Sequence, residues 1–149
     1  ILDNTWRSIF SLTLGTGGSY ANNAEVDGSG GLSFRNWATV DSNIKHYITQ
    51  DKLSVNAVTF SKTASTAKLN SYLNGRLVKS LSGTAGSASP YLGGVIIGCR
   101  YNNTSDTGMA NYFRGLLGPV IVCNCVLTSA QVGKITNQMN ALRRLGVAL

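Results

Sequence analysis

The feature that most constrains this fold is the pair Asn74-Gly75, which separates two runs of alternating residues in KLNSYLNGRLVKSL (Lys68–Leu81). Both central residues of a type I′ turn need a positive φ, and Asn-Gly is the preferred pair for that turn. In a strand, alternation sends every second side chain to the same face. The sequence therefore predicts a β-hairpin over Lys68–Leu81.

Most of the remaining chain also has the composition of β-structure. Charged residues are only 13% of the 149 residues, and 17 glycines supply turns. Strands are predicted at Ile9–Leu14, Ala24–Asp27, Leu32–Trp37, Val55–Lys62, Val95–Arg100 and Gly115–Cys125, with a mixed strand and loop over Ile44–Leu53. Pro119 interrupts the last apolar run, which indicates an edge strand or a bulge there.

One helix is predicted, over Ser129–Leu145. Thr128 and Gln131 have the spacing of a capping box, in which each residue satisfies a backbone N–H of the other. An apolar stripe follows at helical spacing and is expected to pack on the sheets: Val132, Ile135, Met139 and Leu142.

The three cysteines bear on where the chain folds. Cys99, Cys123 and Cys125 are odd in number, so at least one thiol is free or bonded between chains. Cys123 and Cys125 lie two apart in an apolar run, and we expect them to be buried and reduced. Reduced cysteines favour folding in a reducing cytosol.

The formal net charge of +7 reflects a scarcity of acidic residues, with 13 Lys and Arg against 6 Asp and Glu. Only Arg143 and Arg144 are adjacent, and no basic run of the nucleic-acid-binding type occurs, so nucleic acid is not the expected partner. An anionic glycan, a neighbouring subunit or a phosphate backbone could be attracted by such a field, although a basic surface without a dedicated ligand is the simpler interpretation. No apolar run reaches transmembrane length, so membrane insertion is not expected.

Four segments in series resemble the laminin-G, pentraxin and related concanavalin A-like domains. They are VNAVTF (Val55–Phe60), SYLNGRLV (Ser71–Val78), GVIIG (Gly94–Gly98) and FRGLLGPVIVCNCVLTSAQV (Phe113–Val132). The resemblance covers about the last two-thirds of the chain. It implies an all-β, concanavalin A-like jelly-roll β-sandwich with one short C-terminal helix.

The start of the chain departs from that pattern. IFSLTLG (Ile9–Gly15) is similar to the second or third strand of the family. We therefore expect a single laminin-G-like domain over residues 1–149 whose first strand is missing or belongs to a longer protein. An unpaired sheet edge would follow, and such edges favour assembly with another chain.

The resemblance requires a test for catalysis, because the family includes β-glucanases with the strand motif E-x-D-x-x-E. Glu25-Val26-Asp27 begins that motif, but Gly30 occupies the second glutamate position and Glu25 is the only glutamate. Retaining hydrolysis needs two carboxyl groups about 5 Å apart. We therefore predict that the chain is not an enzyme.

Other catalytic and metal chemistry is also disfavoured. His46 is the lone histidine, and no G-x-S-x-G nucleophile motif accompanies it, so a structural role is expected. Cys123 and Cys125 lack the C-x₂₋₄-C spacing of structural zinc sites.

The candidate ligand site is the polar loop between Tyr101 and Tyr112. Asn102, Asn103 and Asp106 supply amide and carboxylate oxygens, and the flanking tyrosines are candidate sugar platforms. Asp106 and Asn103 are the candidate calcium ligands, since the resembling domains often hold calcium in a rim loop. A single carboxylate would bind calcium weakly, and a plain polar loop is the alternative. No other cofactor is expected.

Two functions follow from these features. The first is a non-catalytic structural or attachment module of a virus particle, such as a bacteriophage fibre or capsid decoration. Its partners would be other virion subunits, copies of itself or surface glycans, and it would fold in a reducing cytosol before assembly. The alternative is a cellular carbohydrate-binding or adhesion domain, for which calcium dependence stays open. An assembly protein should bury its sheet edge against a neighbour, whereas a lectin should leave the loop free.

Overall fold

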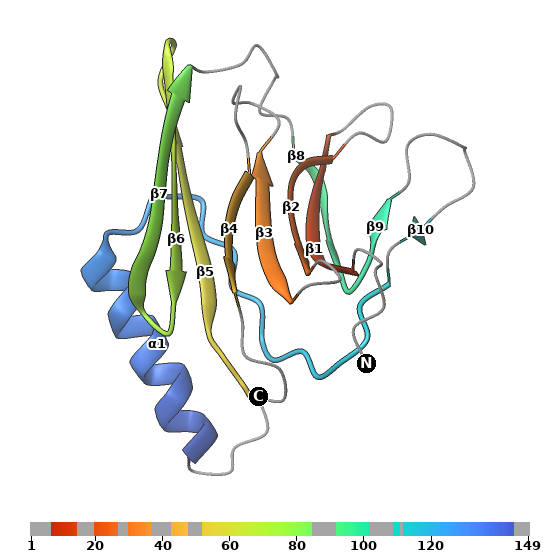
Figure 1. Ribbon diagram of the computed structural model, residues 1–149, viewed down its shortest axis with the longest axis vertical. Coiled ribbons are helices and arrows are strands. Elements are labelled where there is room, and N and C mark those ends of the chain that lie inside the picture. The colour runs from red at the N-terminus through yellow and green to blue at the C-terminus, as the bar shows by residue number, and fades with distance from the viewer. Residues whose placement is uncertain are drawn as a thin grey trace.

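The computed structural model describes residues 7–14, 20–26, 30–36, 43–47, 52–84, 92–101, 109–110 and 112–144 (Figure 1). The elements in chain order are β1 (Arg7–Leu14), β2 (Tyr20–Val26), β3 (Gly31–Asn36), β4 (Asn43–Tyr47), β5 (Asn56–Lys62), β6 (Thr66–Leu73), β7 (Arg76–Thr84), β8 (Leu92–Ile97), β9 (Arg100–Tyr101), β10 (Met109–Ala110) and α1 (Ser129–Arg144). The predicted all-β architecture with one C-terminal helix is confirmed.

The strands form two main antiparallel sheets. One has five strands in the order β4-β3-β2-β1-β8, and the other has three in the order β5-β6-β7. A short pair, β9 and β10, lies beside the first sheet (Figure 1). β4 lies against β6 and β7, so the two sheets meet at that side of the molecule.

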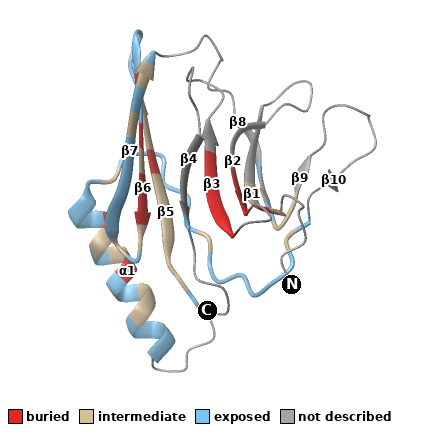
Figure 2. Cartoon of the chain, in the orientation of Figure 1, coloured by how far each residue is buried: buried red, intermediate tan, exposed pale blue. Residues whose placement is uncertain are grey.

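The core lies between these sheets (Figure 2). Ala24 and Val26 of β2 pair in register with Phe34 and Leu32 of β3, and all four are buried. Leu69 of β6 joins the same cluster from the opposite sheet. Burying a Leu or Phe side chain contributes about 1.5–3 kcal/mol, so this cluster is a main source of stability.

The hairpin predicted at Asn74-Gly75 is confirmed as the connection between β6 and β7. Asn74 has φ 51° and Gly75 has φ 80°, the positive values that a type I′ turn requires. The Asn74 side chain also anchors the start of β5, because its Oδ1 accepts a hydrogen bond from Val55 N at 3.0 Å. Asn74 N donates in turn to Val55 O at 2.8 Å.

The hairpin turn packs directly on α1. A Cβ placed on Gly75 would lie 3.3 Å from Gly133 Cα and 3.3 Å from Thr136 Cβ. Val132 and Thr136 are the buried residues of the helix. Tyr72 Oη lies 3.2 Å from Ser129 Oγ, a hydrogen bond between β6 and the first turn of α1. The helix is therefore held to the outer face of the three-stranded sheet.

The predicted helix start is confirmed in its capping geometry. Thr128 Oγ1 accepts a hydrogen bond from Gln131 N at 3.3 Å, and Gln131 Oε1 accepts one from Thr128 N at 2.8 Å. The predicted apolar stripe is only partly correct. Leu142 is exposed, and Thr136, which is not part of the predicted stripe, is buried together with Val132. Thr136 is buried because it faces the hairpin turn at Gly75. The spacing of apolar residues along the helix does not predict this contact.

The strand predicted over Gly115–Cys125 is wrong. Residues 113–128 form no strand and run as an irregular extended segment into α1. Pro119 has no N–H to donate to a ladder, and Gly115 and Gly118 do not favour a strand. The burial expected for Cys123 and Cys125 is wrong for the same reason: without strand pairing, both thiols are exposed, while Cys99 is half-buried.

Candidate binding surfaces

The predicted loop site lies mostly outside the residues that the structure describes. Asn102, Asn103 and Asp106, including the two candidate calcium ligands, fall in that part, so the calcium site stays a prediction. Tyr101 ends β9 and pairs in register with Met109 of β10. The pairing of β9 with β10 brings the two ends of the loop together, as a rim site would require.

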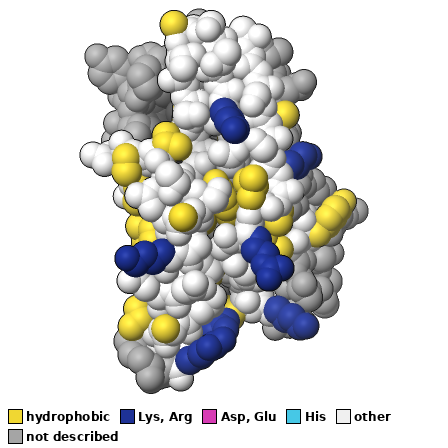
Figure 3. All heavy atoms as spheres, turned by 90° about the vertical axis from the view of Figure 1, so that its left-hand side faces the viewer, with side chains coloured by type: hydrophobic (Ala, Val, Ile, Leu, Met, Phe, Trp, Pro, Cys, Tyr) yellow, Lys and Arg dark blue, Asp and Glu magenta, His cyan; other side chains and the backbone are white. Residues whose placement is uncertain are grey.

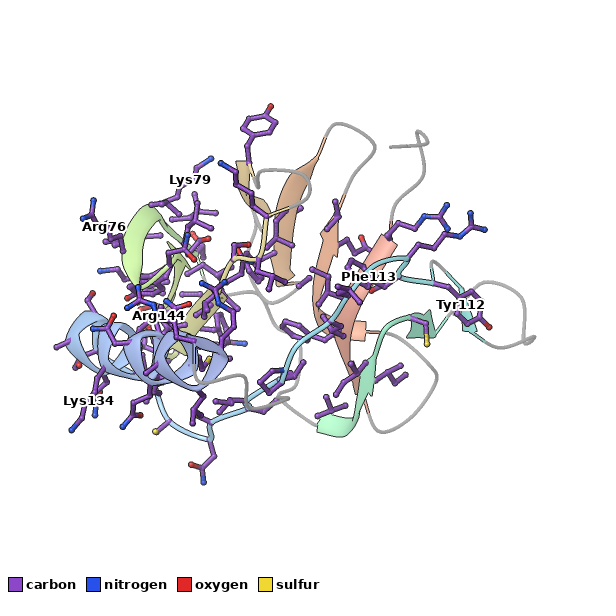
Figure 4. All side chains as sticks on the ribbon, turned by 90° about the horizontal axis from the view of Figure 1, so that it is seen from below. Arg76, Lys79, Tyr112, Phe113, Lys134 and Arg144 are labelled. Carbon is purple, nitrogen blue, oxygen red and sulfur yellow. The ribbon has the colours of Figure 1, made fainter. Side chains whose placement is uncertain are left out.

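Tyr112, the other predicted loop residue, lies beside the start of β1 (Figure 4). It forms a β-bridge with Ser8, and its side chain is 57% exposed. Arg7 Nη1 donates to the Tyr112 carbonyl at 3.4 Å, which ties the backbone of Tyr112 to β1. An exposed tyrosine on a fixed backbone can serve as a stacking surface for a sugar or a protein.

Glu25, which begins the glucanase-like motif, lies among serines rather than carboxylates in the described part of the sheet. It lies on β2 and is fully buried, and its register partners are Ser8 of β1 and Ser33 of β3. Its side chain is on the opposite face of β2 from the core residues Ala24 and Val26. Among the side chains that the structure describes, Glu25 is the only carboxylate, so no paired acid and base are seen there.

Metal binding and membrane spanning were also considered for the described residues. Within them, no group of three His, Cys, Asp or Glu side chains is arranged to hold a metal ion. No helix in this part of the chain is both long enough and apolar enough to span a membrane.

The irregular segment before α1 carries a set of exposed apolar side chains, which we call the apolar strip. Its members are Leu116, Leu117, Ile121, Val122 and Val126. Leu116 is the extreme case at 88% exposed. No charged residue occurs between Arg114 and Lys134, so the whole segment is uncharged as well as apolar. The sequence predicted this run as a strand, with an edge or a bulge at Pro119.

A second surface is basic. Residues 52–84 and 112–144 together contain nine Lys and Arg and no Asp or Glu. Figure 3 shows the face that carries β7 and α1, with Lys and Arg side chains spread over it. The scattered Lys and Arg predict a diffuse basic charge, but the six acidic residues are confined to other parts of the chain.

Comparison with known proteins places these surfaces in a family context. The profile of the concanavalin A-like lectin/glucanases superfamily (Laminin_G_3) matches residues 2–133. No curated protein sequence matches the chain. A solved structure of an S-layer domain-containing protein from Clostridium thermocellum is similar at 15% identity and a TM-score of 0.42, over 91% of this chain and 65% of that one.

Proposed function

Because this chain belongs to the concanavalin A-like lectin/glucanase superfamily, we propose that it is a non-catalytic assembly or attachment module of a virus particle. Domains of this family serve widely in binding and adhesion, and the particle context is our own step beyond that. The observation that carries the proposal is the apolar strip. A soluble protein seldom leaves so many neighbouring aliphatic side chains in water unless another surface covers them.

The chemistry of the strip suits contact between subunits. It is aliphatic and uncharged, so burying it releases water without the cost of desolvating charged groups. Copies of the same chain are the simplest partner, since most soluble oligomers are assembled from identical subunits.

The cysteines support folding in a reducing cytosol before particle assembly. Cys99, Cys123 and Cys125 are all free, and two of them are exposed. Exposed thiols persist in reducing compartments and are oxidised in secretory ones. The sequence predicted the same compartment from burial of Cys123 and Cys125, whereas in the structure both are exposed.

The apolar strip predicts the oligomeric state. We expect the purified chain to self-associate, and the double variant Leu116→Asp/Ile121→Asp to shift towards monomer by at least tenfold in the dissociation constant, because two buried aliphatic contacts are worth over 1.4 kcal/mol. Size-exclusion chromatography with light scattering measures this shift. Leu77→Asp is the matched control, since Leu77 is an exposed leucine on β7 outside the strip. A wild-type chain that remains monomeric at high concentration would contradict the proposal.

A carbohydrate-binding or adhesion domain is the second candidate, and the exposed side chain of Tyr112 beside the predicted loop favours it. In that case the wild-type chain should bind members of a glycan array, and Tyr112→Ala should weaken that binding. Measuring the array with and without a chelator tests whether Asp106 and Asn103 hold calcium. Absence of glycan binding in both conditions would remove this candidate.

A further inference from the structure

We propose that Cys123 and Cys125 form a redox-active dithiol, which closes to an intrachain disulfide when it meets a small oxidised disulfide such as oxidised glutathione. Both thiols are exposed, and a single residue, Asn124, separates them. They lie between Val122 and Val126, in the exposed segment that carries the apolar strip (Figure 2). This inference goes beyond the assembly role and does not depend on it, because it concerns the chemistry of the thiols.

Neither packing nor a structural metal accounts for this pair. A free cysteine that serves as a small core hydrophobe is buried, whereas both of these thiols are exposed. A structural zinc site needs four ligands, and within the described residues no group of three His, Cys, Asp or Glu side chains is arranged to hold a metal ion. An accessible cysteine next to a second cysteine is instead typical of a redox-sensitive site.

The backbone geometry allows the two cysteines to reach each other. Two residues of a fully extended chain span about 6.6–7.2 Å, whereas the Cα atoms of a disulfide lie about 4.4–6.8 Å apart. The chain bends at Asn124 and Cys125, and a bend shortens the Cα–Cα separation towards the disulfide range. Residues 113–128 form no strand, so no ladder of hydrogen bonds holds Cys123 and Cys125 at the extended spacing.

Proximity favours a bond within the chain over a bond between chains. A partner on a short flexible connection has an effective concentration on the order of 1 mM, about a thousandfold above that of a second chain in a solution of about 1 µM. Cys123 therefore reacts with Cys125 of its own chain before it meets another chain.

The third cysteine, Cys99, is not expected to take part. It is half-buried and lies between β8 and β9. Its neighbour Gly98 is held on both sides, because Gly98 N donates to Ile9 O at 2.7 Å and Gly98 O accepts from Phe113 N at 2.7 Å. The odd number of cysteines thus divides into one thiol on a fixed backbone and one exposed pair.

The reaction exchanges one disulfide for another. One cysteine thiolate attacks oxidised glutathione, which forms a mixed disulfide and releases one glutathione. The second thiolate attacks the protein sulfur of the mixed disulfide and releases the other glutathione, so the protein loses two protons and two electrons and oxidised glutathione gains them. A strained and exposed disulfide is easily reduced, so the pair should be open in a reducing cytosol and closed outside it.

The test exposes the full chain to oxidised glutathione at micromolar protein concentration and measures its intact mass. The variant Leu116→Asp/Ile121→Asp is measured beside the wild type, so that access to the thiols does not depend on assembly through the strip. We expect both proteins to lose two hydrogens per chain, to retain no glutathione and to recover their original mass in dithiothreitol. Peptide mapping should place the new bond between Cys123 and Cys125.

Two further variants separate the pair from Cys99. Cys99→Ser keeps the pair and should lose two hydrogens as the wild type does. Cys125→Ser removes one partner, so its reaction should stop at the mixed disulfide and the chain should retain one glutathione on Cys123.

An unchanged mass, or glutathione retained on both Cys123 and Cys125, would overturn the inference, because the two thiols would then not close on each other. A covalent dimer of Leu116→Asp/Ile121→Asp would assign the bond to two chains, and a loss of two hydrogens that persists in Cys125→Ser would assign it to Cys99. Either result would also overturn the inference. A wild type that closes the disulfide but stays monomeric at high concentration would overturn the assembly role alone.

Discussion

Replacing Leu69 by Ala is expected to lower the free energy of unfolding by about 2–5 kcal/mol, the usual cost of removing a buried leucine side chain and leaving a cavity. Leu69 lies on β6, is 2% exposed and is the member of the core cluster that comes from the three-stranded sheet. Its register partners Phe60 and Leu81 are packed against the same cluster. Urea denaturation followed by circular dichroism measures the change.

The matched control is Leu77→Ala on the neighbouring strand β7. Leu77 undergoes the same chemical change but is 50% exposed. Its replacement should therefore lower the free energy of unfolding by only about 0.5–1 kcal/mol, well below the value for Leu69. The difference between the two variants isolates the packing of one sheet on the other. Similar values for both would mean that Leu69 does not lie between the sheets, and the sandwich arrangement would be wrong.

Features that depend on local chemistry were predictable from the sequence. Asn74-Gly75 specifies its own turn because both residues tolerate positive φ, and the structure has them at 51° and 80°. Thr128 and Gln131 cap the helix through contacts three residues apart. The strand predicted over Val55–Lys62 is present as β5 (Asn56–Lys62), and its Val58 and Phe60 pack against the core.

Features that depend on distant partners were not predictable. The apolar run Gly115–Cys125 resembles a strand, but a strand needs a neighbour to pair with, and no local signal states whether one is present. Burial of Cys123 and Cys125 was inferred from that pairing and failed with it. The approach of Gly75 to Gly133 joins residues far apart in the chain, and neither glycine reveals the other in the sequence.

The candidate binding surfaces divide in the same way. The basic character of the three-stranded sheet and α1 could have been found from the sequence, because the absence of acids from residues 52–84 and 112–144 is visible there. The packing of α1 on the hairpin turn through Gly75 and Thr136 could not, because it joins residues far apart in the chain. The loop from Tyr101 to Tyr112 is predicted as a site from its oxygen-bearing side chains, and its candidate calcium ligands Asn103 and Asp106 lie outside the described residues.

Gly75→Ala is expected to destabilise the protein by about 2–4 kcal/mol, because it combines two independent costs. The first is the backbone conformation: φ is 80°, where a residue with a Cβ is strained by about 1–2 kcal/mol. The second is space, since the new methyl group would lie 3.3 Å from both Gly133 Cα and Thr136 Cβ. The helix would have to move away from the hairpin turn, which would also weaken the Tyr72–Ser129 hydrogen bond.

Two further glycines separate these costs. Gly98 has nearly the same φ, 81°, but a Cβ there would meet no atom within 4 Å, so Gly98→Ala should show the backbone cost alone. Gly83 has neither a positive φ nor a close neighbour, so Gly83→Ala within β7 should be neutral or stabilising by about 0.5–1 kcal/mol. Chemical denaturation of the three variants gives the comparison directly. If Gly75→Ala costs no more than Gly98→Ala, then α1 does not rest on the hairpin turn.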